Sequence, residues 1–187
     1  MKFYNLGLQT QGSRYYLEPI SGSLVQTPVA HTNHKATHPE KLNKSLLLCH
    51  QPYGLNSQPV LPNPKPALAT CLHNLSKRAT RLIWLWRSNL FWLAHLYASF
   101  SKPCLEDSSV AIELFRQETA ALPQNTLCLP RSLFAASSSR RFADTGVLFI
   151  GVFLPARSMH AWIIEDGRQP DFDDPMWVNF QPVAALC

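Results

Sequence analysis

Cys128 and His160 are the two residues of this sequence whose types and spacing most favour covalent chemistry. A cysteine thiolate is the strongest nucleophile among protein side chains, and a neighbouring imidazole can keep it ionised and later protonate a leaving group. Cys128 stands in the run Thr-Leu-Cys-Leu-Pro-Arg-Ser-Leu, and His160 follows thirty-two positions later in His-Ala-Trp. The pair therefore predicts acyl transfer through a thioester.

Each member of this pair falls at a place in the predicted secondary structure that suits its role. A helix is expected to begin around Cys128, with Pro130 in its first turn. A thiol at a helix N-terminus lies beside unpaired backbone N–H groups, which lower its pKa and can bind an oxyanion. His160 falls on a strand predicted over residues 159–165, where it shares a face with Trp162.

A third group is needed to orient the imidazole, and an acidic cluster follows the histidine strand. The cluster contains Asp171, Asp173 and Asp174, after a turn at residues 167–168. A carboxylate from this cluster would hold His160 in one tautomer and stabilise its charged form. A lone cysteine, a lone histidine or a run of Asp is more often structural, so the prediction depends on their combination.

The elements predicted around these residues define an α+β protein. Residues 2–26 alternate apolar and polar side chains between turn signals, which predicts three short strands in an antiparallel meander. A short helix is expected to open at residues 38–40, and four prolines between Pro59 and Pro66 predict an extended linker. Helices are then expected at 68–100, 107–122 and 128–141, the second of them capped by Asp107 or Ser108. Strands are expected at 147–154, 159–165 and 177–183.

The helix predicted over residues 68–100 is very apolar in its second half, where it carries Trp84, Trp86 and Trp92. An arginine in mid-membrane costs roughly 2.5–3.5 kcal/mol on insertion scales, so Arg87 makes a membrane span unexpected. One interpretation is a buried helix. The other is a partly exposed tryptophan face that docks a partner protein.

Composition and charge exclude several classes of protein. Five cysteines without CxxC spacing suggest neither a disulfide framework nor a zinc knuckle, and no secretory signal is evident, so a reducing cytoplasm is expected. The chain is basic before residue 106, which serves solubility or suits an acidic peptide, a nucleotide or an anionic membrane face. Basic clusters interleaved with aromatics are missing, so nucleic acid is not an expected partner. His31, His34 and His38 have no accompanying Cys or acidic ligand, which favours a polar loop over a metal site.

The order of these motifs resembles the lasso peptide biosynthesis B proteins, which are leader peptidases with a transglutaminase-like fold. The resemblance is carried by Cys-Leu-x-Arg-Ser-Leu at residues 128–133, His-Ala-Trp at residues 160–162, and the Asp-rich segment just before a proline. It covers residues 68–187. The motifs are fairly specific for that family.

The resemblance implies a cysteine endopeptidase whose catalytic triad is Cys128, His160 and an Asp. Asp173 is the expected third member and Asp174 the second choice, because the loop from Gly167 is one residue longer than the family pattern. The implied reaction removes the leader from a ribosomally made precursor peptide. No cofactor or metal is expected in this chain, which lacks a Walker-type Gly-rich loop, so any ATP would act through a partner cyclase.

The resemblance also implies a division of the chain. Residues 1–55 would be a winged-helix-like recognition element whose small sheet binds the leader as an added strand. Residues 56–67 would be a linker, and residues 68–187 a transglutaminase- or papain-like domain with helices packed on an antiparallel sheet. The expected partners are the precursor leader and the lasso cyclase that closes the macrolactam ring, with the tryptophan-rich helix as a docking place for the cyclase. The segment after the small sheet is more polar than that family's helix, which leaves the leader contact open.

Two other functions remain open at this point. A transglutaminase or amide ligase would form the same thioester but transfer the acyl group to an amine. A non-catalytic scaffold would only deliver the precursor to the cyclase.

Overall fold

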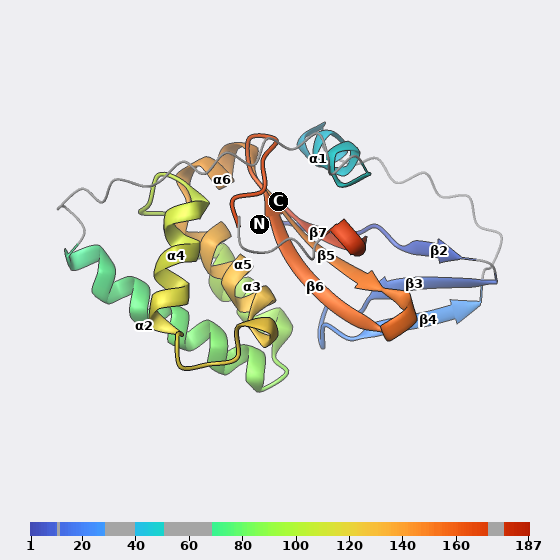
Figure 1. Cartoon of the computed structure of the whole chain (residues 1–187), viewed down its shortest axis with the longest axis horizontal. Coiled ribbons are helices and arrows are strands. Elements are labelled where there is room, and N and C mark those ends of the chain that lie inside the picture. The colour runs from blue at the N-terminus through green and yellow to red at the C-terminus, as the bar shows by residue number, and fades with distance from the viewer. Residues whose placement is uncertain (11, 29–39, 51–68, 172–177) are drawn as a thin grey trace.

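The computed structural model describes residues 1–10, 12–28, 40–50, 69–171 and 178–187. These residues form a mixed α+β structure with a four-stranded antiparallel sheet, a small three-stranded antiparallel sheet and surrounding helices (Figure 1). The predicted α+β class is confirmed at this level. The predicted linker and the tract from His31 to His38 lie outside the described residues.

The larger sheet has the strand order β1-β7-β5-β6, and each neighbouring pair of strands is antiparallel. Its strands are β1 (Phe3–Asn5), β5 (Val147–Phe153), β6 (Ser158–Ile164) and β7 (Gln181–Leu186). Strand β5 is a continuous apolar run because both of its faces are covered. The strands predicted at 147–154 and 159–165 are confirmed to within one residue. The third predicted strand begins later than expected, at Gln181.

Different helices cover the two faces of this sheet (Figure 1). The helices are α1 (Glu40–His50), α2 (Ala69–Arg87), α3 (Phe91–Ser99), α4 (Ser108–Glu118), α5 (Cys128–Ser138) and α6 (Arg140–Thr145). On one face, Leu148 and Ile150 of β5 join the main core with helices α2 to α5. On the other face, Phe149 and Trp162 form a smaller core with Leu42 of α1. Successive side chains of β5 therefore pack into two different cores, one on each face of the sheet.

The N-terminal strands divide between the two sheets. Strands β2 (Leu8–Thr10), β3 (Ser13–Leu17) and β4 (Leu24–Pro28) form the small sheet in that order. Strand β1 instead pairs with the C-terminal strand β7, and the N–H groups of Leu6 and Gly7 both donate to the carbonyl of Val183. The predicted three-stranded antiparallel meander is confirmed as β2, β3 and β4, but residues 2–10 contain two strands, and the first of them, β1, belongs to the other sheet. Pairing with β1 satisfies the backbone groups along the edge of β7, which a local sequence pattern cannot foresee.

The single helix predicted over residues 68–100 consists of two helices. Helix α2 ends at Arg87 and α3 begins at Phe91, and Asn89 between them has a φ of 55°. This left-handed conformation ends an α-helix, and asparagine adopts it more readily than most residues with a side chain. None of the described helices is both long enough and apolar enough to cross a membrane.

The tryptophans of these two helices have different environments. Trp84 is 63% exposed and Trp92 is 41% exposed. Trp86 is half-buried, while Leu75 and Leu82 of α2 are buried in the main core. One face of the helix pair is buried, as the first interpretation predicts, and Trp84 and Trp92 are partly exposed, as the second requires; docking of a partner there stays a prediction.

The helix predicted over residues 128–141 is also divided. Helix α5 stops at Ser139, whose ψ of 130° is extended, and the Ser139 side chain accepts a hydrogen bond from the Phe142 N–H to cap α6. Arg140 and Arg141 therefore open a new helix instead of ending α5. The cap predicted for the preceding helix is confirmed, because the Asp107 carboxylate accepts from the Val110 N–H at the start of α4.

Candidate active site

Cys128 is the first residue of helix α5, as the sequence predicts. A 3-10 turn ends at Thr126, and the buried Leu127 follows it as the cap residue. The first helical hydrogen bond runs from the Arg131 N–H to the Leu127 carbonyl at 2.9 Å. Pro130 occupies the first turn, where a missing N–H costs no helical hydrogen bond. The Cys128 side chain is half-buried at this helix start.

Helix α5 begins beside strand β6, which is an edge strand of the four-stranded sheet. Ala161 of β6 makes hydrogen-bond contacts between the two elements. The Ser132 hydroxyl donates to the Ala161 carbonyl at 3.1 Å. The Ala161 N–H donates a hydrogen bond to the Cys128 sulfur. Both backbone groups of Ala161 therefore bind the first turns of α5, which fixes the thiol beside the strand that carries His160.

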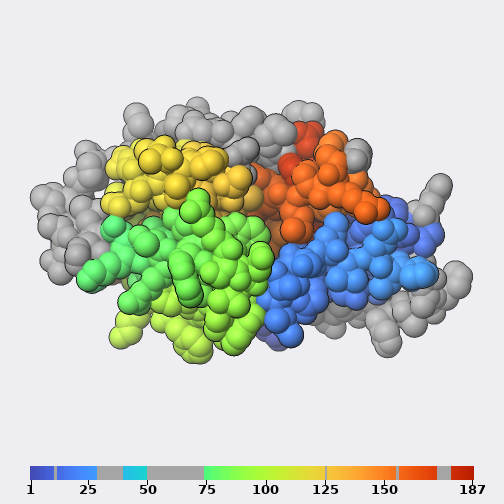
Figure 2. Space-filling view, turned by 90° about the horizontal axis from the view of Figure 1, so that it is seen from below, coloured from blue at the N-terminus to red at the C-terminus, as the bar shows by residue number. Residues whose placement is uncertain are grey.

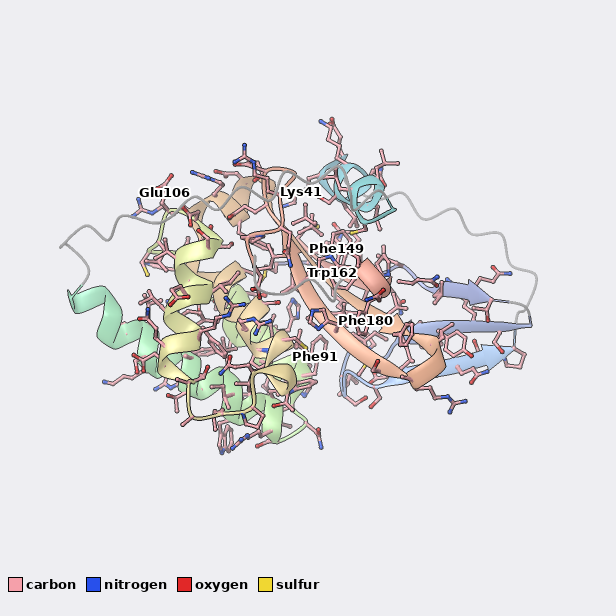
Figure 3. The ribbon with its side chains drawn as sticks, viewed as in Figure 1. Lys41, Phe91, Glu106, Phe149, Trp162 and Phe180 are labelled. Atoms are coloured by element: carbon pink, nitrogen blue, oxygen red, sulfur yellow. The ribbon has the colours of Figure 1, made fainter. Side chains whose placement is uncertain are left out.

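The imidazole of His160 forms a hydrogen bond with the Cys128 thiol. Its ring packs against Phe180, with centroids 5.1 Å apart, and lies nearly parallel to Trp162 at 6.3 Å. Trp162 in turn stacks on Phe149 at 5.7 Å, and Figure 3 labels these three aromatic side chains on adjoining strands and the segment before β7. The shared face predicted for His160 and Trp162 is confirmed.

The pKa of the Cys128 thiol is lowered from its ordinary value. Burial of the sulfur raises this pKa, but the hydrogen bond and charge of His160, the Ala161 N–H and the charge of Arg131 lower it and prevail. Burial has the opposite net result at Cys49, where it raises the pKa of the thiol to about 12. Of these two thiols, Cys128 is therefore the one whose surroundings favour the nucleophilic thiolate.

The acidic cluster after β6 is described only in part. Asp173, the expected third member of the triad, and Asp174, its alternative, lie outside the described residues. Asp171 is described and is buried, with ion pairs to Arg116 of α4 and Arg131 of α5. The Arg131 Nε atom lies 2.9 Å from Asp171 Oδ2. The first residue of the acidic cluster is thus buried and ion-paired and does not belong to a solvated turn.

Sequence reasoning did not single out this buried ion-pair cluster, although one signal pointed to it. Arg131 lies one turn after Cys128, within a helix whose neighbouring positions Leu129 and Leu133 are apolar and buried. Arginine is rarely buried without a partner, so an arginine in an apolar stretch of helix implies an acidic residue from another segment. Which acid it would be could not be read from the pattern.

Glu165, directly after β6, is a second buried carboxylate that the sequence reasoning missed. It accepts hydrogen bonds from the N–H and hydroxyl of Ser108, both at 3.0 Å, and from the Ser139 hydroxyl at 2.6 Å. Burial raises the pKa of Glu165 above its ordinary value, although these hydrogen bonds act in the other direction. The carboxylate ties the end of the His160 strand to the starts of α4 and α6.

A cavity of about 290 Å³ opens beside Cys128 and His160. Its other walls come from segments far apart in the sequence. Leu17 and Gly22 belong to the N-terminal hairpin, formed by β3 and β4, Trp86 belongs to α2, and Ile150 and Met159 belong to the four-stranded sheet. The sequence patterns did not predict that this hairpin lies beside Cys128. A nucleophile, a proton donor and acceptor, and a mostly apolar cavity are therefore assembled at one point.

Within the ranges that the structure describes, no three His, Cys, Asp or Glu side chains are grouped closely enough to hold a metal ion. No family model matches the chain, and neither a curated protein nor a solved structure matches it with significant similarity. The residues of the site and their geometry are therefore the basis on which a function is inferred.

Proposed function

We propose that this protein is a cysteine endopeptidase that removes the leader from a lasso peptide precursor. The observation that carries the proposal is the hydrogen bond between Cys128, at the N-terminus of α5, and His160, on the edge strand β6. A nucleophile and its acid–base partner must touch, and the lowered pKa of this thiol favours its thiolate form. The resemblance of residues 128–133 and 160–162 to the lasso B proteins supports the choice of substrate.

In the first proposed step, the Cys128 sulfur bonds to the carbonyl carbon at the leader–core junction. The carbon–nitrogen bond breaks, and the protonated His160 gives its proton to the departing nitrogen. The core then leaves with a free amino terminus, while the leader remains attached to sulfur as a thioester. The unpaired N–H groups in the first turn of α5 are the donors best placed by position to bind the oxyanion.

In the second proposed step, the neutral His160 accepts a proton from water. The hydroxide oxygen bonds to the thioester carbon, the carbon–sulfur bond breaks, and its electron pair returns to Cys128. The leader is released with a free carboxyl group, and the thiolate–imidazolium pair is restored. We assign Asp173 the task of orienting His160, with Asp174 as the alternative.

The proposal places a separate ATP-dependent cyclase after this enzyme. The free amino terminus produced by cleavage is the nucleophile that such a cyclase would join to an Asp or Glu side chain of the core. Any ATP requirement would then belong to the cyclase.

The test uses purified full-length chain, a short precursor peptide encoded beside its gene, and the neighbouring cyclase with or without ATP. Mass spectrometry should show the hydrolysed leader and core, and Cys128→Ala should slow this cleavage by at least about 10³-fold. Cys104→Ala is the matched control, because Cys104 is an exposed cysteine that does not line the cavity beside Cys128. Unchanged cleavage by Cys128→Ala would refute the peptidase and favour a scaffold, whereas a crosslinked product would favour an amide ligase.

A further inference from the structure

The cavity beside Cys128 is built partly by the N-terminal hairpin. Leu17, at the end of β3, and Gly22, in the turn before β4, line it together with Trp86 of α2. Figure 2 shows the N-terminal strands, in blue, lying against the helices drawn in green and the strands drawn in orange. The segment that sequence reasoning assigns to leader recognition thus reaches the candidate active site itself.

This wall is fixed to helix α3. The Trp92 N–H at the start of α3 donates to the Ile20 carbonyl at 3.3 Å. Gly22 has a φ of 69°, and a Cβ at this position would lie 2.9 Å from the Phe91 ring, so only glycine fits here without displacement. The Glu18 carboxylate accepts from the N–H groups of Ile20 and Ser21, which closes the turn. The cavity wall is therefore held in place by backbone and ring contacts.

The chemistry of the cavity wall is apolar. Apart from Cys128 and His160, the polar side chain that lines it is the hydroxyl of Thr126, and no Lys, Arg, Asp or Glu side chain is among the described lining residues. Away from Cys128 and His160, which the proposed reaction uses, a charged group in this space would lose its hydration and find no counter-ion among the described lining residues. An aliphatic group would instead exchange water for contact with Leu17, Trp86 and similar side chains.

We propose that this cavity binds an uncharged apolar side chain of the substrate, belonging to the residue that supplies the attacked carbonyl. The inference rests on the proposed function in taking that residue to be the last one of the leader. The acyl residue stays bonded to the Cys128 sulfur through the thioester stage, so a cavity that opens at this sulfur can hold its side chain through both steps. Trp86 and Leu17 are the residues that set this preference.

Peptide aldehydes test the cavity without requiring turnover. In such a probe the Cys128 sulfur bonds to the aldehyde carbon, the carbonyl oxygen takes up a proton, and a reversible hemithioacetal forms. We compare acetyl-Gly-Gly aldehydes that end in Leu, Asp or Lys, and measure how well each protects Cys128 from iodoacetamide by peptide mapping. The Leu aldehyde should protect at a concentration about tenfold or more below that of the Asp and Lys aldehydes.

A matched pair of variants on helix α2 locates the preference. Trp86→Ala should reduce the advantage of the Leu aldehyde to about threefold or less, because it removes one apolar wall. Trp84→Ala should leave the advantage unchanged, since Trp84 is 63% exposed and does not line the cavity. Trp86→Phe should retain most of the preference. Equal behaviour of Trp86→Ala and Trp84→Ala would overturn the assignment of Trp86.

The outcomes separate this inference from the proposed function. If the wild-type chain cleaves a precursor but all three aldehydes protect within about twofold of one another, the inference is wrong and the peptidase stands. If the aldehydes are ranked as expected but no precursor is hydrolysed, the inference stands and the peptidase is wrong.

Discussion

The guanidinium of Arg131 meets the carboxylate of Asp171 in a buried ion pair with an Nε–Oδ2 distance of 2.9 Å, one helical turn beyond Cys128. Arg116 of α4 binds the other carboxylate oxygen of Asp171. Two cations therefore share the carboxylate of Asp171. Asp171, which these two arginines bind, is also the first residue of the acidic cluster after β6.

Substitutions of the two partners in this ion pair should shift the pKa of Cys128 in opposite directions. Arg131→Gln removes a positive charge beside the thiol and should raise its pKa. Asp171→Asn removes the negative charge that offsets Arg131 and should lower it. The measurement is the pH dependence of Cys128 alkylation by iodoacetamide, followed by peptide mapping.

This pair of variants separates electrostatics from folding. Both substitutions break the same buried contact, so loss of positioning alone would move the pKa of Cys128 in one common direction. A shift of the same sign in both variants would therefore contradict an electrostatic role for Arg131. Arg131→Lys, which keeps the charge, should stay closer to the wild-type profile than Arg131→Gln.

The contact between His160 and Cys128 predicts how reactivity depends on pH. His160 lowers the pKa of Cys128, whereas burial raises it, so His160→Ala should shift that pKa upward. Alkylation of Cys128 should then be slowed at pH 7 and recover at pH 10. Cys104, an exposed cysteine, is the internal control in the same digests. An unchanged profile in His160→Ala would show that the imidazole does not stabilise the thiolate.

Glu165 should make the folded protein less stable as the pH rises. Because burial raises the pKa of this carboxyl in the folded state, that state binds the proton more readily than the unfolded chain does. The contribution of Glu165 is therefore most favourable below its ordinary pKa of 4.5, and is lost as the pH rises through the raised folded-state pKa. Urea unfolding at pH 4.5 and 7.5 should show a smaller decline for Glu165→Gln than for the wild type.

The matched control for that comparison is Glu113→Gln. Glu113 lies on the exposed face of α4 and accepts a hydrogen bond from Gln117 one turn away. Because the Glu113 side chain is exposed, its substitution should leave the free energy of unfolding within about 0.5 kcal/mol of the wild type. Equal slopes for all three proteins would mean that Glu165 does not titrate with a raised pKa.

Gly151 is predicted to be a position that admits no side chain. A Cβ there would lie 2.6 Å from the Trp162 ring and 2.9 Å from the Gln181 carbonyl oxygen. Gly151→Ala should reduce the free energy of unfolding by about 1–3 kcal/mol, as overpacking of a buried site does. It should also slow Cys128 alkylation at neutral pH, because Trp162 lies nearly parallel to the His160 ring.

The Trp162→Leu background identifies the source of that cost. If the indole causes the clash, Gly151→Ala should cost less in this background than in the wild-type chain. An equal cost in both backgrounds would assign the clash to the backbone of Gln181 instead. Unfolding in urea gives both differences.

Much of the local structure around the site followed from the sequence. The start of α5 at Cys128, the cap at Asp107 and the shared face of His160 and Trp162 are confirmed, because prolines, caps and strand alternation act over a few residues. The breaks at Asn89 and Ser139 were not predicted. Each depends on the backbone conformation of one residue, left-handed at Asn89 and extended at Ser139, which the apolar pattern of the stretch does not reveal.

By itself, the sequence determined which residues have the chemistry and which local element carries each of them. The tertiary structure decided which elements meet. The N-terminal strand β1 pairs with the C-terminal strand β7, and Leu17 and Gly22 of the hairpin line the cavity. Asp171 forms ion pairs with arginines of two different helices. The physical reason is that these contacts join segments far apart in the chain. Local periodicity specifies a buried face, but only packing of the complete chain selects what covers it.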